Sequence, residues 1–253
     1  MDLLILGCGY TGRRVAARFL AKGARVTVTT REPERLNIAG AEVIRVDEVA
    51  ARVCRGVMVL HSIPPNGPAD LLSALGRAPE RVVYLSSTAI YGSAGFVNEH
   101  TPVDLSSERV RARVEAEREV MAGPWSSLVL RPAAIYGPGR GIQESMRRGA
   151  YTLSDLYVSR IHVDDLAAHA EAGLLSTVTG AYPVADEEPC TSREMAEFCA
   201  GLLGVELGPG HDAPSRFSSN RRVDGSAIRK LLGIELRYPS YRVGVPASLR
   251  MAE

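Results

Sequence analysis

The chain has 253 residues, which is enough for one large domain or for a nucleotide-binding domain with a small second lobe. With 45% apolar and 23% charged residues, its composition is ordinary for a soluble globular protein. The net charge of +1 gives no basis for binding nucleic acid or anionic membranes, and no apolar run is long enough to cross a bilayer, so neither partner is expected.

The first two dozen residues carry the most informative pattern in the chain. An apolar run at residues 3–6 predicts a buried strand, and residues 7–12 follow it as Gly-x-Gly-x-x-Gly. Apolar residues then recur at helical spacing up to Gly23, which has the position of a glycine that ends a helix. A strand, a glycine turn and a helix in this order form the phosphate cradle of a dinucleotide-binding fold. The residues expected to bind the cofactor here are Gly7, Gly9, Tyr10, Thr11 and Gly12.

The second predicted strand, Arg25–Thr30, ends at the position that selects the cofactor. Enzymes of this fold that use NAD usually have an acidic residue there, which bonds the ribose 2′-hydroxyl. This chain has Arg31, whose planar guanidinium suits the 2′-phosphate of NADP. The alternative is that Arg31 is solvated and that Glu32 binds the ribose. We therefore expect NADP, with NAD possible.

The next two predicted strands, residues 42–46 and Val57–His61, end beside the same cleft. Asp47 closes the first of them, where the adenine ring would lie, although a turn carboxylate has the same sequence pattern. Ser62 follows the second strand and is expected to bind the cofactor, because open α/β sheets bind ligands at the carboxyl ends of their strands. His61 is more simply a hydrogen-bonded structural histidine.

Strand and helix patterns go on alternating along the chain. Strands are predicted at residues 81–86, 126–131 and 181–185, and helices at 68–77, 105–121, 163–175 and 192–203, the last with a capping box at Thr191 and Glu194. The 105–121 helix is charged on most faces and has a narrow apolar stripe of Val110, Val114 and Met121. Residues 208–219 are predicted to form a loop. This alternation favours a doubly wound parallel α/β sheet.

The cysteines give no metal site, because Cys8, Cys54, Cys190 and Cys199 lack the spacing of metal ligands. They are expected to be reduced thiols. The first predicted strand begins too early for a leader peptide to precede it. Together these features predict a cytoplasmic protein without a metal.

Three blocks resemble the extended short-chain dehydrogenases/reductases, in the NAD-dependent epimerase/dehydratase branch. Residues 85–92 (LSSTAIYG) resemble that branch's strand-five signature, 130–140 (LRPAAIYGPGR) its strand-six signature, and 161–167 (IHVDDLA) a later strand-to-helix element. The resemblance implies a Rossmann-type sheet with a small C-terminal substrate lobe, and a possible homodimer. Residues 1–137 and about 161–186 would form the dinucleotide-binding domain, and residues 138–160 and 187–253 the lobe.

The resemblance also implies a reacting centre. In the family, the Ser or Thr four residues before the tyrosine of the Tyr-Gly pair bonds the reacting oxygen of the substrate, and that position here is Ser87. Family members carry Tyr-x-x-x-Lys at the start of the next long helix, where the tyrosine is the general acid/base and the lysine holds the nicotinamide ribose. This chain has Arg109 and Arg113 there, and no tyrosine lies between Tyr91 and Tyr136.

The two arginines change the chemistry that this resemblance implies. An arginine stays protonated and has no lone pair, so Arg109 does not replace the catalytic tyrosine. Arg113 is expected to bind the cofactor, as the lysine would, and the pair also suits an anionic substrate. The alternative is a solvated basic helix face shared with Arg111 and Arg118. The chain thus resembles an atypical member that lacks the Tyr-x-x-x-Lys pair.

Two functions follow from these observations. The first is an NAD(P)-binding oxidoreductase or epimerase-like enzyme for a small carbonyl or sugar-type substrate, with Ser87 as its catalytic residue. The second is a catalytically impaired NADP-binding sensor or regulatory module. A serine hydrolase using Ser87, His162 and Asp164 or Asp165 is disfavoured, because the chain has no Gly-x-Ser-x-Gly turn.

Overall fold

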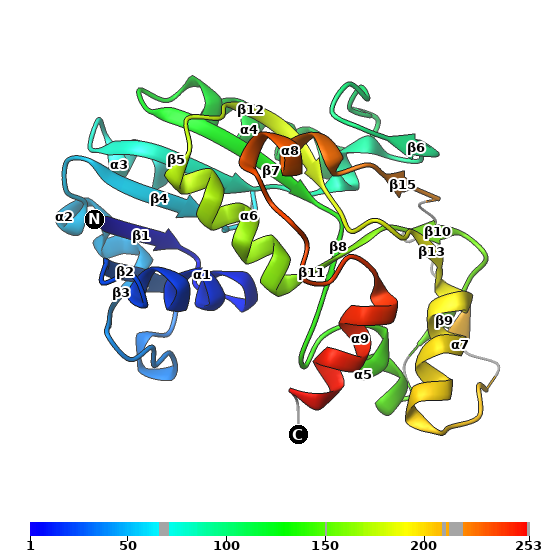
Figure 1. Ribbon diagram of the computed structural model, residues 1–253. Helices are drawn as coiled ribbons and strands as arrows, with labels where there is room; N and C mark the ends of the chain where they lie inside the picture. The colour runs from blue at the N-terminus through cyan, green and yellow to red at the C-terminus, as the bar shows by residue number, and fades with distance from the viewer. Residues whose placement is uncertain (66–70, 150, 209–210, 213–219, 252–253) are drawn as a thin grey trace.

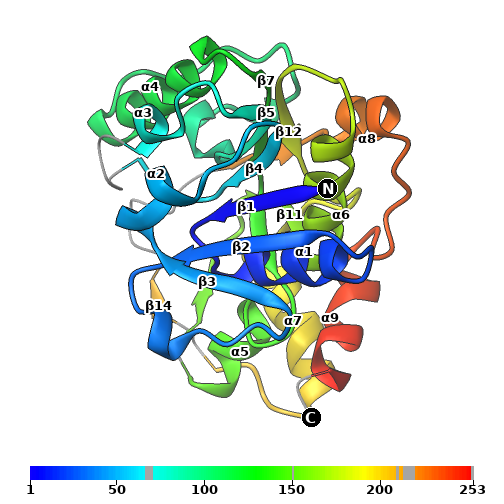
Figure 2. The same ribbon diagram turned by 90° about the vertical axis from the view of Figure 1, so that its left-hand side faces the viewer.

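A parallel sheet runs through the middle of the molecule, in the part of the chain that the computed structural model describes: residues 1–65, 71–149, 151–208, 211–212 and 220–251. Its strand order is β12-β7-β5-β4-β1-β2-β3 (Figures 1 and 2). The strands are β1 (Asp2–Leu6), β2 (Arg25–Thr30), β3 (Ala41–Arg45), β4 (Val57–His61), β5 (Pro79–Leu85), β7 (Ser126–Pro132) and β12 (Gly180–Val184). Each neighbouring pair is parallel, which confirms the predicted doubly wound α/β fold of Rossmann type.

Helices cover both faces of this sheet. One face carries α1 (Tyr10–Leu20), α6 (Val163–Leu175) and α8 (Ser226–Leu232), and the other carries α2 (Val49–Arg52), α3 (Leu71–Leu75) and α4 (Glu108–Ala122). Short 3₁₀ turns follow β2 at Pro33–Arg35 (η1), β3 at Val46–Glu48 (η2) and β5 at Thr88–Tyr91 (η3). The carboxyl ends of the strands remain uncovered by these helices, and that edge holds the candidate site.

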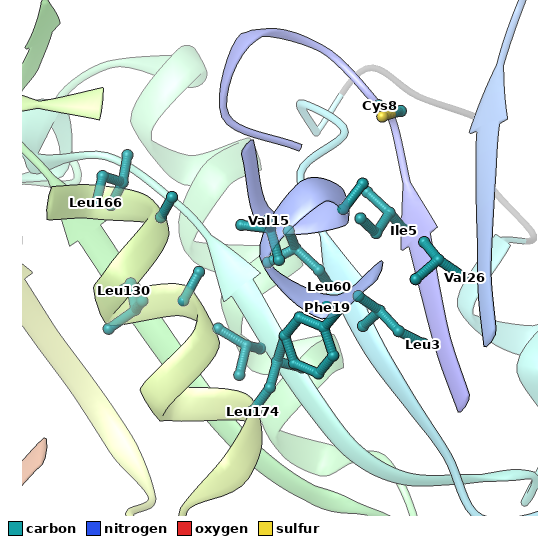
Figure 3. Packing of buried hydrophobic residues seen from close by; sticks show 14 of the residues in the cluster. Leu3, Ile5, Cys8, Val15, Phe19, Val26, Leu60, Leu130, Leu166 and Leu174 are labelled. Carbon is teal, nitrogen blue, oxygen red and sulfur yellow. The ribbon is translucent and has the colours of Figure 1, made fainter. Parts of the chain in front are cut away.

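The core explains why β1 is apolar along its whole length. Leu3 and Ile5 face α1 and α6, while Leu4 and Leu6 face the opposite layer. Figure 3 shows Phe19 of α1 lying among Leu3, Leu60 and Leu174. Successive residues of β1 are thus buried on alternate faces of the sheet. This packing fixes β1 and α1 relative to each other on the two sides of the glycine turn.

A smaller lobe lies on the side toward which the sheet strands point (Figure 1). Its elements are β8 (Ala134–Tyr136), α5 (Ile142–Arg147), β9 (Thr152–Leu153), β10 (Tyr157–Val158), β11 (Arg160–His162), β13 (Cys190–Thr191), α7 (Ser192–Leu203), β14 (His211–Asp212) and α9 (Tyr241–Arg250). The pair β6 (Phe96–Val97) and β15 (Arg222–Val223) joins the lobe segments to the region after β5. The lobe has its own apolar core, which includes Tyr136, Met195 and Tyr241.

Several predicted elements have the bounds that the sequence pattern indicates. β2, β4 and α6 begin and end at the predicted residues. The capping box of α7 is present, because the Thr191 hydroxyl accepts from the Glu194 N–H at 3.0 Å while Glu194 accepts from the Thr191 N–H at 2.7 Å. Gly23 has φ +73°, as its place after α1 requires. These features depend on residues that are close together in the chain.

Other details of the predictions were wrong. α4 begins at Glu108 instead of residue 105, because the Ser107 hydroxyl caps it by accepting the Val110 N–H at 3.2 Å. Met121 is 42% exposed and does not continue the apolar stripe, whose place is taken by buried Glu117 and Val120. Asp47 lies in η2, beyond the end of β3.

Two predictions extend beyond the described residues. Of the predicted helix at 68–77, residues 71–75 are helical, and residues 68–70 lie outside the described part of the chain. Of the predicted loop at 208–219, His211–Asp212 pairs with β9, and most of the rest lies outside. The division into two domains stays a prediction. Helix α8 belongs to the residue range assigned to the lobe, but it packs on α6 and β12 of the dinucleotide-binding part.

The described helices include none that is both long enough and apolar enough to cross a membrane. No group of three metal-binding side chains occurs in the same residues. The four cysteines are free. Burial raises the pKa of Cys8, which lies inside the glycine turn, to about 11. Its thiol is therefore protonated at neutral pH.

Candidate functional site

The glycine turn at the end of β1 packs closely against β1 itself and against the residues that follow β4. Gly7 has φ +83°, and a Cβ atom on it would lie 2.8 Å from Cγ1 of Ile63, so no other residue fits without strain. A Cβ atom on Gly12 would lie 3.2 Å from the Gly7 carbonyl oxygen and from Cγ2 of Ile5. Gly9 is exposed, and no atom lies within 4 Å of where its Cβ would be. The turn is tight on its inner side and open on its outer side.

The N-terminus of α1 is free to bind an anion. Its first turn has neither a capping side chain nor an acidic residue. The N–H groups and the partial positive charge of the helix end are therefore available to a ligand. Thr11 is buried, so it offers its backbone N–H rather than its side chain. Together with the exposed Gly9, this arrangement fits the pyrophosphate of a dinucleotide.

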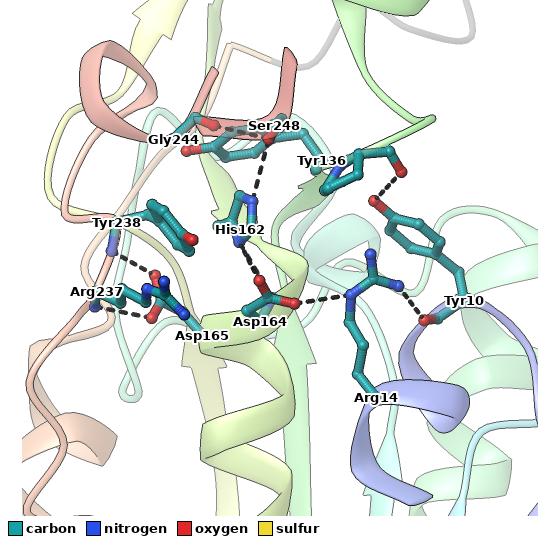
Figure 4. A network of polar contacts seen from close by, with 12 residues as sticks. Tyr10, Arg14, Tyr136, His162, Asp164, Asp165, Arg237, Tyr238, Gly244 and Ser248 are labelled. Carbon is teal, nitrogen blue, oxygen red and sulfur yellow. Dashed lines mark hydrogen bonds and ion pairs between the residues drawn. The ribbon is translucent and has the colours of Figure 1, made fainter. Parts of the chain in front are cut away.

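Tyr10 connects this cradle to the loop after β8 (Figure 4). Its hydroxyl donates to the Pro138 carbonyl oxygen at 2.9 Å. Two guanidinium groups lie close to its ring, that of Arg14 at 4.3 Å and that of Arg140 at 5.3 Å from the ring centroid. Arg14 also bonds Asp164 of α6 at 2.8 Å. These contacts hold the predicted cofactor residue Tyr10 at the junction of sheet and lobe.

The end of β2 presents Arg31 to solvent. In the described part of the chain, no hydrogen bond or ion pair engages its guanidinium. Glu32, the alternative ribose ligand, forms an ion pair with Arg35 at 2.9 Å. Asp47 is also exposed and bonds Arg45 at 3.1 Å. Among the residues near the adenosine end of the cleft, Arg31 is thus free to bind, while both carboxylates already have a cationic partner.

Ser62 fastens the end of β4 to the glycine turn. Its hydroxyl donates to the Gly7 carbonyl oxygen at 2.5 Å. His61, just before it, is buried against Tyr84 with ring centroids 4.8 Å apart. Burial lowers the pKa of His61 to about 4, so this histidine is neutral at pH 7. The Ser62 hydroxyl thus stabilises the turn, and its role in binding the cofactor stays a prediction.

A cavity of about 780 Å³ opens at the carboxyl end of β5. Ser87, Arg109 and Arg113 all line it, together with Arg221 from the segment before β15. A second hollow of about 490 Å³ lies against Pro64 and the same face of α4, and both α4 arginines line it as well. The structure therefore brings Ser87 together with Arg109 and Arg113, the two residues that the sequence resemblance aligns with the family's Tyr and Lys.

Ser87 caps the short η3 turn. Its side-chain oxygen accepts the Ala89 N–H at 3.1 Å, and its backbone is extended. The hydroxyl hydrogen has no acceptor among the described residues and is free to donate to a ligand in the cavity. Capping and ligand binding are thus compatible in Ser87, because they use different parts of the hydroxyl group.

Glu117 is a residue whose importance sequence reasoning missed. It is 1% exposed, forms an ion pair with Arg131 at 2.7 Å, and accepts a hydrogen bond from Ser86, the neighbour of Ser87. Arg131 also donates to the Tyr91 hydroxyl at 3.0 Å. This network fixes α4 against the ends of β5 and β7 and so positions the α4 arginines. The available signal was an acidic residue on the same helix face as Val110 and Val114.

Of the residues of the disfavoured hydrolase, His162 and Asp164 lie together, with Nδ1 and Oδ2 3.7 Å apart, but Ser87 does not join them. His162 caps α6 by accepting the Asp164 N–H at 3.2 Å, and its other ring nitrogen lies 3.1 Å from the Ser248 hydroxyl (Figure 4). Asp165 accepts two backbone N–H groups, at 2.9 Å each, from residues 237 and 238. Burial lowers the pKa of His162 to about 4. In the described residues, no hydrogen bond joins this group to Ser87.

Four curated relatives match most of the chain, among them Protein YeeZ of Escherichia coli at 27% identity over 93% of this chain and 95% of its own length, whereas no protein-family model matches it. A 3-diazoavenalumate denitrifying reductase from a Streptomyces species is 25% identical over 97% of this chain and 99% of its own length. A (4-alkanoyl-5-oxo-2,5-dihydrofuran-3-yl)methyl phosphate reductase from Streptomyces griseus is 30% identical over 81% of this chain and 75% of its own length.

Solved structures resemble the whole chain. A conserved protein of unknown function from Silicibacter pomeroyi has a TM-score of 0.85, is 33% identical, and covers 100% of this chain and 99% of its own. A protein from Methylobacillus flagellatus, described as an NAD-dependent epimerase/dehydratase, has a TM-score of 0.81 and 26% identity over 99% and 98% of the two chains. The enzyme WbmG of Bordetella bronchiseptica, solved with NAD, has a TM-score of 0.82 and covers 99% of this chain and 93% of its own. At 18% sequence identity, this likeness shows the fold alone.

Proposed function

The chain belongs to the NAD-dependent epimerase/dehydratase branch of the extended short-chain dehydrogenases/reductases, and from this we propose that it is an NADP-dependent reductase of a small carbonyl compound. One observation carries the proposal: Ser87, Arg109 and Arg113 line a single cavity beside an open dinucleotide cradle. The names of two of the curated relatives describe reductases, which favours reduction over epimerisation.

The residues present fit a nicotinamide dinucleotide. Gly7, Gly9 and the uncapped end of α1 would hold the pyrophosphate, and Ser62 and Arg113 would lie toward the nicotinamide ribose. The unpaired Arg31 supports NADP, because a guanidinium forms charge-assisted hydrogen bonds with a phosphate. Bound NADPH supplies a hydride to the substrate carbon.

Ser87 is the catalytic residue of the proposal. Its free hydroxyl hydrogen would bond the carbonyl oxygen, where negative charge develops during reduction. Arg113 would bond a ribose hydroxyl while keeping its charge, and Arg109 would add positive charge without giving up a proton. The side chains of Ser87 and Arg113 thus position the substrate and cofactor next to each other.

The proton for the carbonyl oxygen comes from water in this proposal. Tyr136 is buried in the lobe core with its hydroxyl directed to the Ser240 carbonyl, and Tyr157 stacks on Arg222. Neither tyrosine is among the residues that line the cavity. Loss of a positioned acid typically lowers rates by about 10²–10⁴-fold, so we expect slow turnover on unactivated ketones.

A second function is favoured by the missing tyrosine itself. An NADP-binding sensor or regulatory module would need the cradle and Arg31 but not a proton donor. It predicts tight binding of NADPH without its oxidation. The two functions share the cofactor site and differ only in whether the cavity supports hydride transfer.

Titration with NADPH and NADH tests the cofactor site. Replacing Arg31 by Glu should weaken NADPH binding by about tenfold or more, because a charge-assisted bond is lost, while NADH affinity changes little. Arg55→Glu is the matched control, since Arg55 is also exposed but precedes β4 at the opposite end of the strands. Equal losses for the two cofactors would contradict the NADP assignment.

Oxidation of NADPH, followed at 340 nm over a panel of aldehydes and ketones, then separates the two functions. Turnover of any carbonyl at a rate above the protein-free blank supports the reductase. Binding of NADPH with no turnover on any compound supports the sensor. Failure of both cofactors to bind at millimolar concentration would overturn both functions together.

A further inference from the structure

We propose that the substrate of the cavity at the end of β5 carries a phosphate monoester, and that Arg109 and Arg221 bind this group. The inference rests on the proposed function, because it concerns the same cavity and deepens the assignment of its substrate. It starts from the charged groups that line the cavity, which come from segments far apart in the sequence.

Among the described residues that line the cavity, four are charged: Asp104, Arg109, Arg113 and Arg221. None of the three arginines forms an ion pair with a carboxylate in the described part of the chain. Asp104 is turned to the backbone, where it accepts the Ser106 N–H at 2.9 Å. The cavity therefore has a formal charge of +2, which matches a phosphate monoester at about −1.5 to −2 better than a monocarboxylate.

Arg221 is held rigidly at the rim of the cavity. Its backbone N–H donates to the Tyr157 carbonyl at 3.0 Å, and its guanidinium donates to the Gly92 carbonyl, a residue 129 positions away in the chain. The remaining guanidinium hydrogens have no partner among the described residues. A guanidinium fixed in this way loses little freedom when it binds an anion.

The uncharged lining also fits a small phosphorylated compound. Seven serines line the cavity: Ser87, Ser93, Ser106, Ser107, Ser154, Ser159 and Ser192. Ser159 already donates to the Arg221 carbonyl oxygen at 3.3 Å, and hydroxyl groups of the kind that the other serines carry suit phosphate oxygens. No aromatic ring occurs among the described residues of the lining, so a nucleobase would find nothing to stack on there. This composition favours a phosphorylated carbonyl compound without a nucleotide.

The test uses pairs of compounds that differ only by the phosphate. In the presence of saturating NADP⁺, which cannot reduce them, dihydroxyacetone phosphate should bind at least about tenfold more tightly than dihydroxyacetone, measured by calorimetry. Arg221→Gln should remove most of this difference and leave the Kd for NADPH unchanged, and Arg109→Gln should also remove most of the difference. Arg109→Gln guards against a folding defect, because Arg109 is exposed and makes no bond to the described residues.

Arg222→Gln is the matched control, since Arg222 is adjacent but stacks on Tyr157 outside the cavity. Equal binding of the two compounds, or an equal effect of Arg222→Gln and Arg221→Gln, would overturn the inference. Acetate that binds as tightly as inorganic phosphate would also overturn the inference. If NADPH does not bind, titration of the free protein with inorganic phosphate tests the site by itself. Loss of phosphate binding in Arg221→Gln supports the site. Loss of phosphate binding only in Arg31→Gln refutes it.

Discussion

At the scale of single residues, the hydroxyl hydrogen of Ser87 is free to donate a hydrogen bond, because no acceptor engages it among the described residues. Its oxygen accepts the Ala89 N–H at 3.1 Å, so the hydroxyl hydrogen is the part that faces a ligand. We expect Ser87→Ala to lower kcat by about 10²-fold, as loss of a donor to a developing oxyanion does elsewhere. The Kd for NADPH should not change. Steady-state NADPH oxidation and a binding titration measure the two quantities.

Ser93→Ala is the control for this prediction, because Ser93 lines the same cavity and is exposed. An equal fall in kcat for both variants would assign Ser87 a role in shaping the cavity only.

At the scale of secondary structure, α4 is attached to the sheet through a buried ion pair. Replacing Glu117 by Gln would leave the Arg131 guanidinium buried without a charge partner, and the Ser86 hydrogen bond would weaken. We expect the free energy of unfolding to fall by about 3 kcal/mol. Urea unfolding, followed by circular dichroism, gives this difference.

The exposed Glu119 of the same helix provides the comparison. Glu119→Gln should change the unfolding free energy by less than about 0.5 kcal/mol, as expected for a surface position. Matching unfolding midpoints for the Glu117 and Glu119 variants would show that the buried pair contributes nothing net. This prediction concerns folding alone and does not depend on the identity of the substrate.

At the scale of the whole molecule, buried titratable groups determine how stability depends on pH. Burial lowers the pKa of His61, His162 and His169 to about 4, below the 6.5 of an exposed histidine. The unfolded state therefore binds more protons between pH 4 and 6.5, and the three histidines make stability rise with pH across that window.

Asp186 acts in the opposite direction. It is 3% exposed with neither carboxylate oxygen hydrogen-bonded to the described residues, and burial raises its pKa to about 8. The folded state keeps this proton between about pH 4 and 8, so stability falls as pH rises there. Three histidines outweigh one aspartate below pH 6.5, and we expect the melting temperature to be highest near that pH.

The Asp186→Asn variant tests this balance. It should not lose stability from pH 6.5 to 8, whereas the native protein should lose stability toward pH 8. Differential scanning calorimetry in buffers from pH 4.5 to 8.5 measures both profiles. A native protein whose melting temperature rises steadily to pH 8 would contradict the assigned protonation of Asp186.

Much of the fold could be predicted because it depends on neighbours in the chain. Periodicity located β2, β4 and α6, and the capping box at Thr191 located α7. The lobe was harder to predict. Its strands are mostly two or three residues long, too short for an alternating pattern, and α9 contains Pro246, which normally interrupts a helix pattern. The homodimer and the cytoplasmic location stay predictions.

The sequence by itself determined the cradle, because a glycine's backbone freedom and the start of a helix are properties of residues 2–23 alone. It also predicted, through the family resemblance, that Arg109 and Arg113 stand where the family has a proton donor and its partner. Only the tertiary structure decided what else meets them. Glu117 finds Arg131, and Arg221 reaches Gly92 and the cavity of Ser87, through contacts that side-chain packing creates between distant segments. Such contacts have no pattern along the chain, because the free energy that selects them arises from burial in three dimensions.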